Sequence, residues 1–231
     1  MWIAPRAQSD HVDVWFADLA DSTFDHGVEH LDSTERARAA RLAGVGLGHR
    51  FERAHSALRR LLCAYTRCAP HTLAFRRGLH GKPYLLNHRL EFNMSHSGNL
   101  WMVAVGMDPL GVDVEIVTDP APQEAAPLVF GSNELAALRG THVDQRDALF
   151  FRLWVRKEAV LKALGRGFWQ DPRELNATDP AGRPLAVHDD PGGDCSTLDM
   201  PEMPEMPNIA AALACASHVS TVHCRHWRVR D

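Results

Sequence analysis

The chain has 231 residues, of which 45% are hydrophobic and 23% charged, and its formal net charge is −4. This balance excludes a disordered chain, a collagen and a coiled coil, and the length is enough for one large hydrophobic core or two small ones. A mildly acidic chain disfavours a nucleic-acid partner, and neither a run of ~18 apolar residues nor a signal-peptide pattern indicates a membrane, so we expect a cytoplasmic protein.

Two helices are predicted between residues 32 and 65. Asp32 and Glu35 have the spacing of a capping box, so the first helix should begin there, and glycines at 44, 46 and 48 should end it. The second helix carries an apolar stripe that includes His55, which makes a core histidine one interpretation of that residue. Seven arginines and two glutamates lie between 35 and 60, which indicates either a solvated helix face or a surface for an anion.

Short apolar runs broken by Gly, Pro and Asn predict strands at 90–94, 100–105 and 111–117. Side chains alternate between faces, so Asp113 and Glu115 share one face of the third strand while the valines between them point into the core. Two carboxylates this close repel each other unless a cation lies between them. The pair therefore indicates either acids that face water or ligands for Mg²⁺, which prefers hard oxygen donors.

A polar turn follows the strand at 90–94. Ser95, His96 and Ser97 offer hydroxyl and imidazole donors, and Gly98 permits a tight turn. The segment is interpreted either as a loop that cradles a phosphate or as a hairpin turn. Upstream, Gly81-Lys82-Pro83 places a lysine on a constrained turn.

The strongest helical pattern lies at 146–164 and ends at Gly165-Arg-Gly167. Lys157 interrupts its apolar stripe, whereas Glu158 and Lys162 lie at i and i+4 on the neighbouring stripe. These residues indicate either an ordinary surface ion pair worth ~0.3 kcal/mol, or a site where Lys157 meets an anion and Glu158 acts as a metal ligand or general base.

Beyond residue 170 the pattern weakens into a Pro-, Gly- and acid-rich loop at 189–207 and one buried strand at 209–217. Helices mixed with strands, followed by much the same again, predict an α+β fold in two halves, 1–109 and 110–231.

Metal sites built from histidine or cysteine are disfavoured. His26 to His30 matches an H-x-x-E-H zinc pattern, but a third ligand is not evident, and 14 histidines make chance matches common, including the group near the end of the chain. Five cysteines, an odd number without a Cys-x-x-Cys pair, fit neither a disulfide framework nor a zinc ribbon.

Four motifs, taken in chain order, resemble the signature blocks of 4′-phosphopantetheinyl transferases. They are Gly81-Lys82-Pro83, Asn93-x-Ser95-His96-Ser97, Gly111-Val-Asp113-Val-Glu115 and Trp154-x-x-Lys157-Glu158-Ala159-x-x-Lys162-x-x-Gly165-x-Gly167. The resemblance covers residues 81–167, and the length and two-half organisation are similar to the monomeric surfactin type.

The resemblance implies two α+β halves related by a pseudo-twofold, with coenzyme A in the cleft between them and Mg²⁺ against Asp113, Glu115 and Glu158. A serine of an acyl or peptidyl carrier protein would attack the β-phosphate of coenzyme A, accept the phosphopantetheine arm and release 3′,5′-ADP. Glu158 and Lys162 are the implied catalytic residues, because Glu158 would help to deprotonate the serine and Lys162 would offset charge on the pyrophosphate.

The implied coenzyme A contacts come from several motifs. Ser95 and His96 would hold phosphates, Lys157 would join Lys162 at the pyrophosphate, and the turn at Lys82 and Pro83 would flank the adenine. Many relatives place an arginine for the 3′-phosphate where this chain has His55, so we expect either a pH-sensitive affinity for coenzyme A or compensation by Arg36, Arg38 or Arg59. Glu134 matches a further family acid.

Two alternatives remain open. A non-catalytic module that binds coenzyme A or a carrier protein on the same fold would be favoured by loss of the acids, yet Asp113, Glu115 and Glu158 are all present. A different Mg²⁺-dependent phosphotransferase acting on a nucleotide lacks the support of a Walker loop or a dinucleotide-binding glycine fingerprint.

Overall fold

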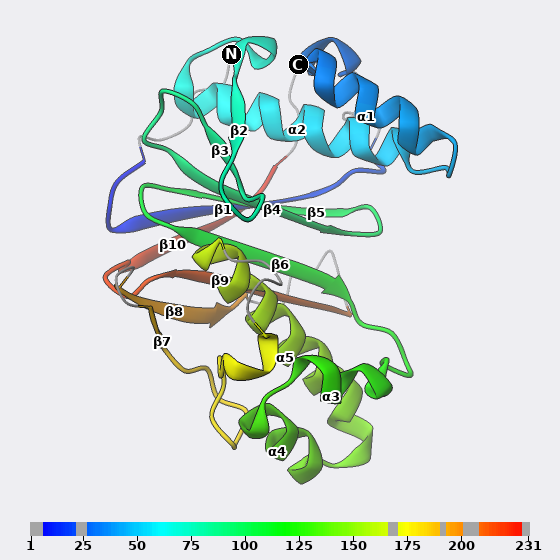
Figure 1. The fold of residues 1–231 in the computed structure, drawn as a ribbon, viewed down its shortest axis with the longest axis vertical. Helices are drawn as coiled ribbons and strands as arrows, with labels where there is room; N and C mark the ends of the chain where they lie inside the picture. Colours follow the sequence, from blue (N-terminus) through cyan, green and yellow to red (C-terminus); the bar gives the residue numbers. More distant parts are fainter. Residues whose placement is uncertain (1–6, 22–26, 166–170, 190–192, 201–207, 228–231) are drawn as a thin grey trace.

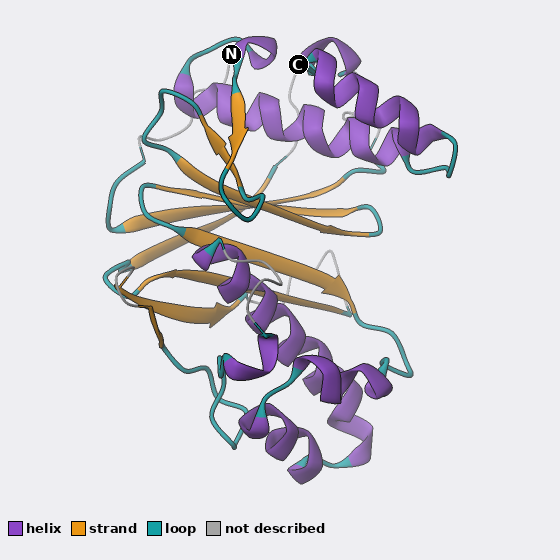
Figure 2. Cartoon of the chain, in the orientation of Figure 1, coloured by secondary structure: helices purple, strands orange, loops and turns teal. Residues whose placement is uncertain are grey.

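A computed structural model describes residues 7–21, 27–165, 171–189, 193–200 and 208–227 of the chain. Two four-stranded sheets face each other at its centre, and helices cover their outer faces (Figure 1, Figure 2). The layers therefore follow the order helix, sheet, sheet, helix. This arrangement confirms the predicted α+β class.

The first sheet has the strand order β10-β1-β5-β4. Its strands are β1 (His11–Asp18), β4 (Glu91–Ser97), β5 (Leu100–Gly106) and β10 (Thr221–His226). β5 is buried throughout, because Met102 and Ala104 face the second sheet while Trp101 and Val103 face the helices. A strand buried on both faces is a continuous apolar run, which is why the sequence predicted β5.

Two helices cover the outer face of the first sheet. They are α1 (Ser33–Ala43) and α2 (Gly48–Thr66), with short 3-10 turns at Val28–His30 and Pro70–Thr72 and a small hairpin of β2 (Phe75–Arg77) and β3 (Pro83–Leu85) beside them. The capping box is confirmed, since Asp32 accepts the Glu35 backbone N–H and Glu35 accepts that of Asp32. The α2 stripe, including Leu58 and Leu61, packs on Trp101.

The second sheet has the strand order β6-β9-β8-β7. Its strands are β6 (Leu110–Ile116), β7 (Val187–Asp189), β8 (Gly193–Asp199) and β9 (Ile209–Ala216). The helices of this half are α3 (Ala126–Val129), α4 (Ser132–Gly140) and α5 (Val143–Leu164), with 3-10 turns at Gln123–Ala125 and Pro172–Glu174. α5 packs across the outer face of the sheet and ends at Gly165, whose φ of 65° is left-handed, as predicted.

The two sheets share an apolar core. Val12, Val14 and Phe16 of β1 pack in one cluster with Val112 and Val114 of β6. Because side chains alternate, the face of β6 that carries Asp113 and Glu115 is turned away from this core. The core between the sheets therefore fixes the direction in which both acids point.

The end of the chain departs from the expected halves. The boundary at residue 109 falls between β5 and β6, but β10 returns to the first sheet and pairs in parallel with β1, from His11 opposite Thr221 to Phe16 opposite His226. Trp227 packs in the core of the first half, 5.4 Å from the Trp101 ring centroid. The last described strand of the chain therefore belongs to the first sheet, although it follows the second half in sequence.

Two sequence features have simple structural outcomes. Within the described residues, no helix combines the length and apolar character needed to cross a membrane. The zinc-like pattern ends in the single 3-10 turn Val28–His30, and its His26 lies outside the described residues, as does Gly167.

Candidate functional site

The acids expected to bind a metal lie where β6 meets α5. Asp113 of β6 is 3% exposed, and Lys162 of α5 places Nζ 2.5 Å from Asp113 Oδ1. Ser95 of β4 donates its hydroxyl to the same oxygen at 2.7 Å and lies 3.2 Å from Lys162 Nζ. The fold thus brings a serine, an aspartate and a lysine from three different elements into direct contact.

The close approach of α5 to β6 depends on Gly111. A Cβ at this position would lie 2.1 Å from the Ala159 carbonyl oxygen and 2.4 Å from the Ala163 nitrogen. Only glycine leaves room for the helix backbone here. Because α5 lies this close to β6, Lys162 Nζ also donates to the Val112 carbonyl at 3.2 Å.

We expect Gly111→Ala to lower the free energy of unfolding by about 3 kcal/mol, because overpacking forces a backbone shift. The matched control is Gly140→Ala, since a Cβ there would meet nothing within 4 Å. Urea unfolding checks both variants. Equal stability of the two would show that the contact between β6 and α5 is not tight.

Glu115 and Glu158 complete an acidic group around Asp113. Burial is the main cause that raises the pKa of Glu158, and Asp113 and Glu115 raise it further against the opposing charge of Lys162. Burial also raises the pKa of Glu115, and Asp113 adds to this, whereas a hydrogen bond from Ser97 lowers it. Besides burial, repulsion between like charges raises the pKa of Glu115 and of Glu158, so the group carries more negative charge than Lys162 alone offsets.

The donor set suits the Mg²⁺ that the resemblance implies. Asp113 Oδ2 is buried and has no hydrogen-bond partner, which costs free energy unless a ligand meets it. In the described part of the chain, no three His, Cys, Asp or Glu side chains form a ready-made metal cluster. Mg²⁺ usually takes only one or two carboxylates, since waters and substrate phosphates complete its coordination. The acids therefore fit this ion.

His96 lies on the face of β4 opposite Ser95. Partial burial is the main cause that lowers the pKa of His96, and the positive charges of Arg50, His55 and Lys162 lower it further. Positive charges on α2 and α5 thus act on the His96 imidazole, which favours an anionic ligand. Sequence reasoning did not single out Arg50, because a run of seven arginines does not show which of them faces β4.

The loop expected around Ser95–Ser97 is part of a hairpin. β4 continues to Ser97, and Gly98, with φ of 58°, begins the two-residue turn to Leu100. Of the two interpretations, the hairpin turn is therefore the one observed. The hydroxyl groups of Ser95 and Ser97 point from a regular strand toward β6 instead of lining a phosphate-binding loop.

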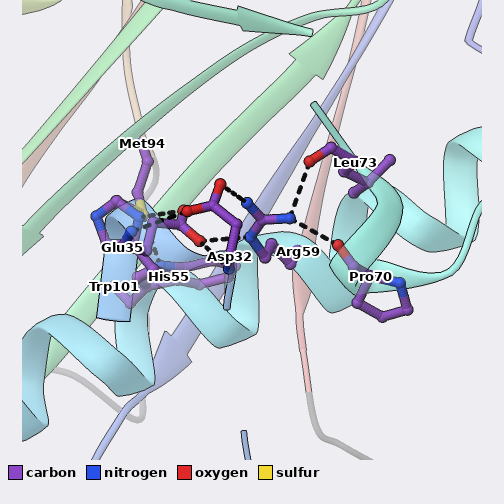
Figure 3. A network of polar contacts seen from close by, with 8 residues as sticks. All are labelled: Asp32, Glu35, His55, Arg59, Pro70, Leu73, Met94 and Trp101. Carbon is purple, nitrogen blue, oxygen red and sulfur yellow. Dashed lines mark hydrogen bonds and ion pairs between the residues drawn. The ribbon is translucent and has the colours of Figure 1, made fainter. Parts of the chain in front are cut away.

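Arg59 is held inside the first half by the start of α1 (Figure 3). It is fully buried and donates to Asp32 Oδ2 and Glu35 Oε2, each at 2.6 Å. It also donates to the carbonyls of Pro70 and Leu73. All of its donor groups face protein acceptors, so Arg59 holds the helices together and does not compensate for a missing phosphate ligand.

His55 belongs to the same network (Figure 3). Its Nδ1 lies 3.2 Å from Glu35 Oε1, and its ring stacks on Phe51 at 3.9 Å between centroids. Burial alone would raise the pKa of Glu35, but His55 and Arg59 outweigh it and lower that pKa. The His55 side chain is only 21% exposed, so it is a packed histidine. It also lowers the pKa of His96 electrostatically.

The other two arginines expected to compensate have local partners. Arg36 donates to the Leu31 carbonyl, and the Arg38 guanidinium lies 5.2 Å from the Phe51 ring centroid. The structure does not bring Arg36 to the acidic group or to His96. Arg50 is instead the arginine whose charge acts on His96.

Lys82 connects the two halves. Its Nζ donates to the Leu110 carbonyl at 2.9 Å and to the Ala163 carbonyl at 3.1 Å, and burial lowers its pKa. These bonds fix the turn before Pro83, at the start of β3, against the first residue of β6 and the last turn of α5. The turn lies beside the site, but its ammonium group already has protein acceptors.

Lys157 lies away from the acidic group. Its Nζ is 3.1 Å from Glu134 Oε2 and donates to the carbonyls of Pro172 and Leu175 at 2.6 Å. The two side chains are 3% and 0% exposed, and Glu134 also accepts the Gly131 backbone N–H at 2.7 Å. The expected place of Lys157 at a pyrophosphate does not match this geometry, because the buried ammonium presents no surface to a ligand.

Comparisons with known proteins show the family of the chain. Residues 109–206 match the family model described as the 4′-phosphopantetheinyl transferase superfamily. The 4′-phosphopantetheinyl transferase HetI of Nostoc sp. is 34% identical over 167 residues, which cover 69% of this chain and 70% of HetI. The chain belongs to this superfamily. The matched residues of this chain include Asp113 and Glu115 of β6 and the whole of α5.

Other relatives match over shorter segments. The slr0495 protein of Synechocystis sp. is 36% identical over 143 residues, which cover 59% of this chain and 58% of that protein. A 4′-phosphopantetheinyl transferase of Bacillus subtilis is 36% identical over 89 residues, covering 38% of this chain and 39% of its own. The chain thus spans less than two thirds of the length of these two superfamily members.

Proposed function

We propose that this protein transfers the 4′-phosphopantetheine arm of coenzyme A to a serine of an acyl or peptidyl carrier protein. The proposal includes Mg²⁺ as cofactor, 3′,5′-ADP as second product and a cytoplasmic monomer as the active form. The observation that carries it is the contact of Lys162 with Asp113 beside Glu115 and Glu158, in a member of this superfamily.

The reaction exchanges one bond at the β-phosphorus of coenzyme A. The serine Oγ forms a new bond to that phosphorus, the bond to the oxygen that bridges the two phosphorus atoms breaks, and 3′,5′-ADP leaves with this oxygen. Glu158 accepts the serine proton. Its raised pKa suits this role, because a base with a pKa nearer the working pH holds the proton more readily.

The remaining residues have positioning and electrostatic roles. Mg²⁺ held by Asp113, Glu115 and Glu158 would neutralise charge on the pyrophosphate. Lys162, which is 28% exposed beside Asp113, supplies a second cation at the same phosphates.

The phosphates of coenzyme A need cations on the side of the first half as well. His96, Arg50 and His55 supply positive charge or hydrogen-bond donors there, and the turn at Lys82 and Pro83 lies at the junction of the two halves. Ser95, through its bonds to Asp113 and Lys162, links the phosphate-binding and acidic sides of the site.

Intact-mass spectrometry of apo-carrier proteins tests the proposal. The purified protein is mixed with coenzyme A, Mg²⁺ and a panel of acyl and peptidyl carriers, with EDTA as the control. A gain of one phosphopantetheine per carrier, lost with EDTA, is the expected result. Binding of coenzyme A without any gain on any carrier would favour the non-catalytic module.

We expect Glu158→Gln to lower the transfer rate more than the affinity for coenzyme A. The wild-type rate should rise with pH as Glu158 ionises, because the ionised form is the base. This acidic limb should disappear in the variant. Rate measurements from pH 5 to pH 8 check the first point, and calorimetric titration with coenzyme A checks the second.

The stability of this variant provides an independent control. Folding favours the protonated form of a carboxyl group with a raised pKa, so its stabilising contribution is lost as pH rises through that pKa. Glu158→Gln should therefore melt no lower than wild type at pH 8. Equal losses of rate and of coenzyme A affinity would leave Glu158 a binding role only.

A further inference from the structure

The acidic strand β6 lies beside β4, which belongs to the other sheet (Figure 1). Alternate side chains of β4 form hydrogen bonds with β6. Asn93 Oδ1 accepts the Val112 backbone N–H at 2.8 Å, and two residues further on Ser95 donates to Asp113. A row of polar side chains thus links the edge strands of the two sheets.

Ser97 ends this row with two bonds. Its hydroxyl donates to Glu115 Oε2 at 2.7 Å and accepts the Ile116 backbone N–H at 3.2 Å. A serine hydroxyl has one hydrogen and two lone pairs, and its hydrogen rotates to suit the neighbouring groups. Since the Ile116 N–H lies against a lone pair, the hydroxyl hydrogen is directed toward the carboxylate of Glu115.

We propose that Ser97 is a positioning residue that holds the Glu115 carboxylate in the orientation needed to bind the divalent cation. A glutamate side chain loses rotamer freedom when it binds a metal, and a fixed hydrogen bond removes part of that cost in advance. The Ser97 hydroxyl donates to Oε2 of Glu115, so Oε1 of the same carboxylate takes no part in this bond. The inference rests on the proposed function for the identity of the cation site.

The proposal separates Ser97 from Ser95. Ser95 contacts both Asp113 and Lys162, so a change there would alter the lysine as well as the acid. Ser97 contacts one side chain of the acidic group, Glu115, and a backbone N–H. A variant at Ser97 therefore reports on cation binding through Glu115.

The experiment titrates Mn²⁺ into the full-length protein, with and without saturating coenzyme A, and follows free Mn²⁺ by electron paramagnetic resonance. Ser97→Ala should weaken Mn²⁺ binding about tenfold, the lower end of the effect of losing a hydrogen bond to a metal ligand. Ser97→Cys, close in size but a weak donor, should also weaken it. Ser97→Thr keeps the hydroxyl and should bind Mn²⁺ about as tightly as wild type.

The matched control is Ser196→Ala. Ser196 shares an exposed hydrogen bond of 2.8 Å with Ser217, so this variant removes a strand hydroxyl that touches no acid of the site. It should bind Mn²⁺ like wild type. Melting temperatures of all variants show whether they fold, and the Cys variant tests the proposal if the Ala variant is unstable.

Wild-type Mn²⁺ affinity in both Ser97→Ala and Ser97→Cys would overturn the inference, as would a wild-type protein that binds no Mn²⁺ under either condition. Failure of the proposed function looks different. In that case no carrier gains mass in the transfer assay, while the dependence of Mn²⁺ binding on Ser97 still supports the positioning role.

Discussion

Asp113→Asn should lower the rate of phosphopantetheine transfer about a thousandfold, equivalent to about 4 kcal/mol of transition-state stabilisation. The substitution keeps the volume of a buried side chain but removes the charge that meets Lys162. It also replaces one carboxylate oxygen, such as the unpartnered Oδ2, with an amide NH₂ group that cannot bind a cation. Transfer assays at saturating coenzyme A and increasing Mg²⁺ measure the effect.

The same variant should keep its fold. Lys162 is 28% exposed, so its ammonium group regains water when the aspartate charge is lost, and the melting temperature should fall by only a few degrees. The matched control is Asp147→Asn, which changes an aspartate of α5 that accepts a hydrogen bond from Gln123 at 2.7 Å. Asp113→Asn turnover near that of Asp147→Asn would exclude Asp113 as a metal ligand.

Local signals in the sequence predicted those parts of the structure that depend on neighbours in the chain. The capping box of Asp32 and Glu35 marked the start of α1, and Gly165 marked the end of α5. Strand alternation placed Asp113 and Glu115 on one face of β6, and the structure brings Lys162 to that face. Each of these predictions relied on a period or a spacing within one element.

Pairing between distant elements was not predictable from the same signals. β10 joins β1 across about two hundred residues, and nothing in its six polar-rich residues indicates which strand it meets. Lys157 and Lys162 look alike on one helix, but their roles diverge because Glu134 and the carbonyls at 172 and 175 surround only the first. Partner choice is decided by the tertiary fold.

The pair of Lys157 and Glu134 should therefore contribute mainly to the stability of the fold, and less to catalysis. We expect Glu134→Gln to lower the free energy of unfolding by about 3–5 kcal/mol, because it leaves an uncompensated ammonium group in the core. Urea unfolding measures the loss. The control is Glu124→Gln at an exposed position, which should change stability by less than about 0.5 kcal/mol.

Lys157→Met and the double variant separate pairing from burial. The single change leaves the Glu134 carboxylate buried without its cation, so it should cost about as much as Glu134→Gln. With both changes neither member of the pair carries a charge, so the double variant should be more stable than the sum of the two losses predicts.

The affinity for coenzyme A, measured at a temperature where the variants stay folded, decides the role of Lys157. Successive helix residues point about 100° apart, so Glu158 can face β6 while Lys157 anchors α5 to the segment around Pro172. Folded Lys157→Met should then bind coenzyme A within about threefold of wild type, about 0.6 kcal/mol. A large loss of affinity in the folded variant would instead place Lys157 at the phosphates.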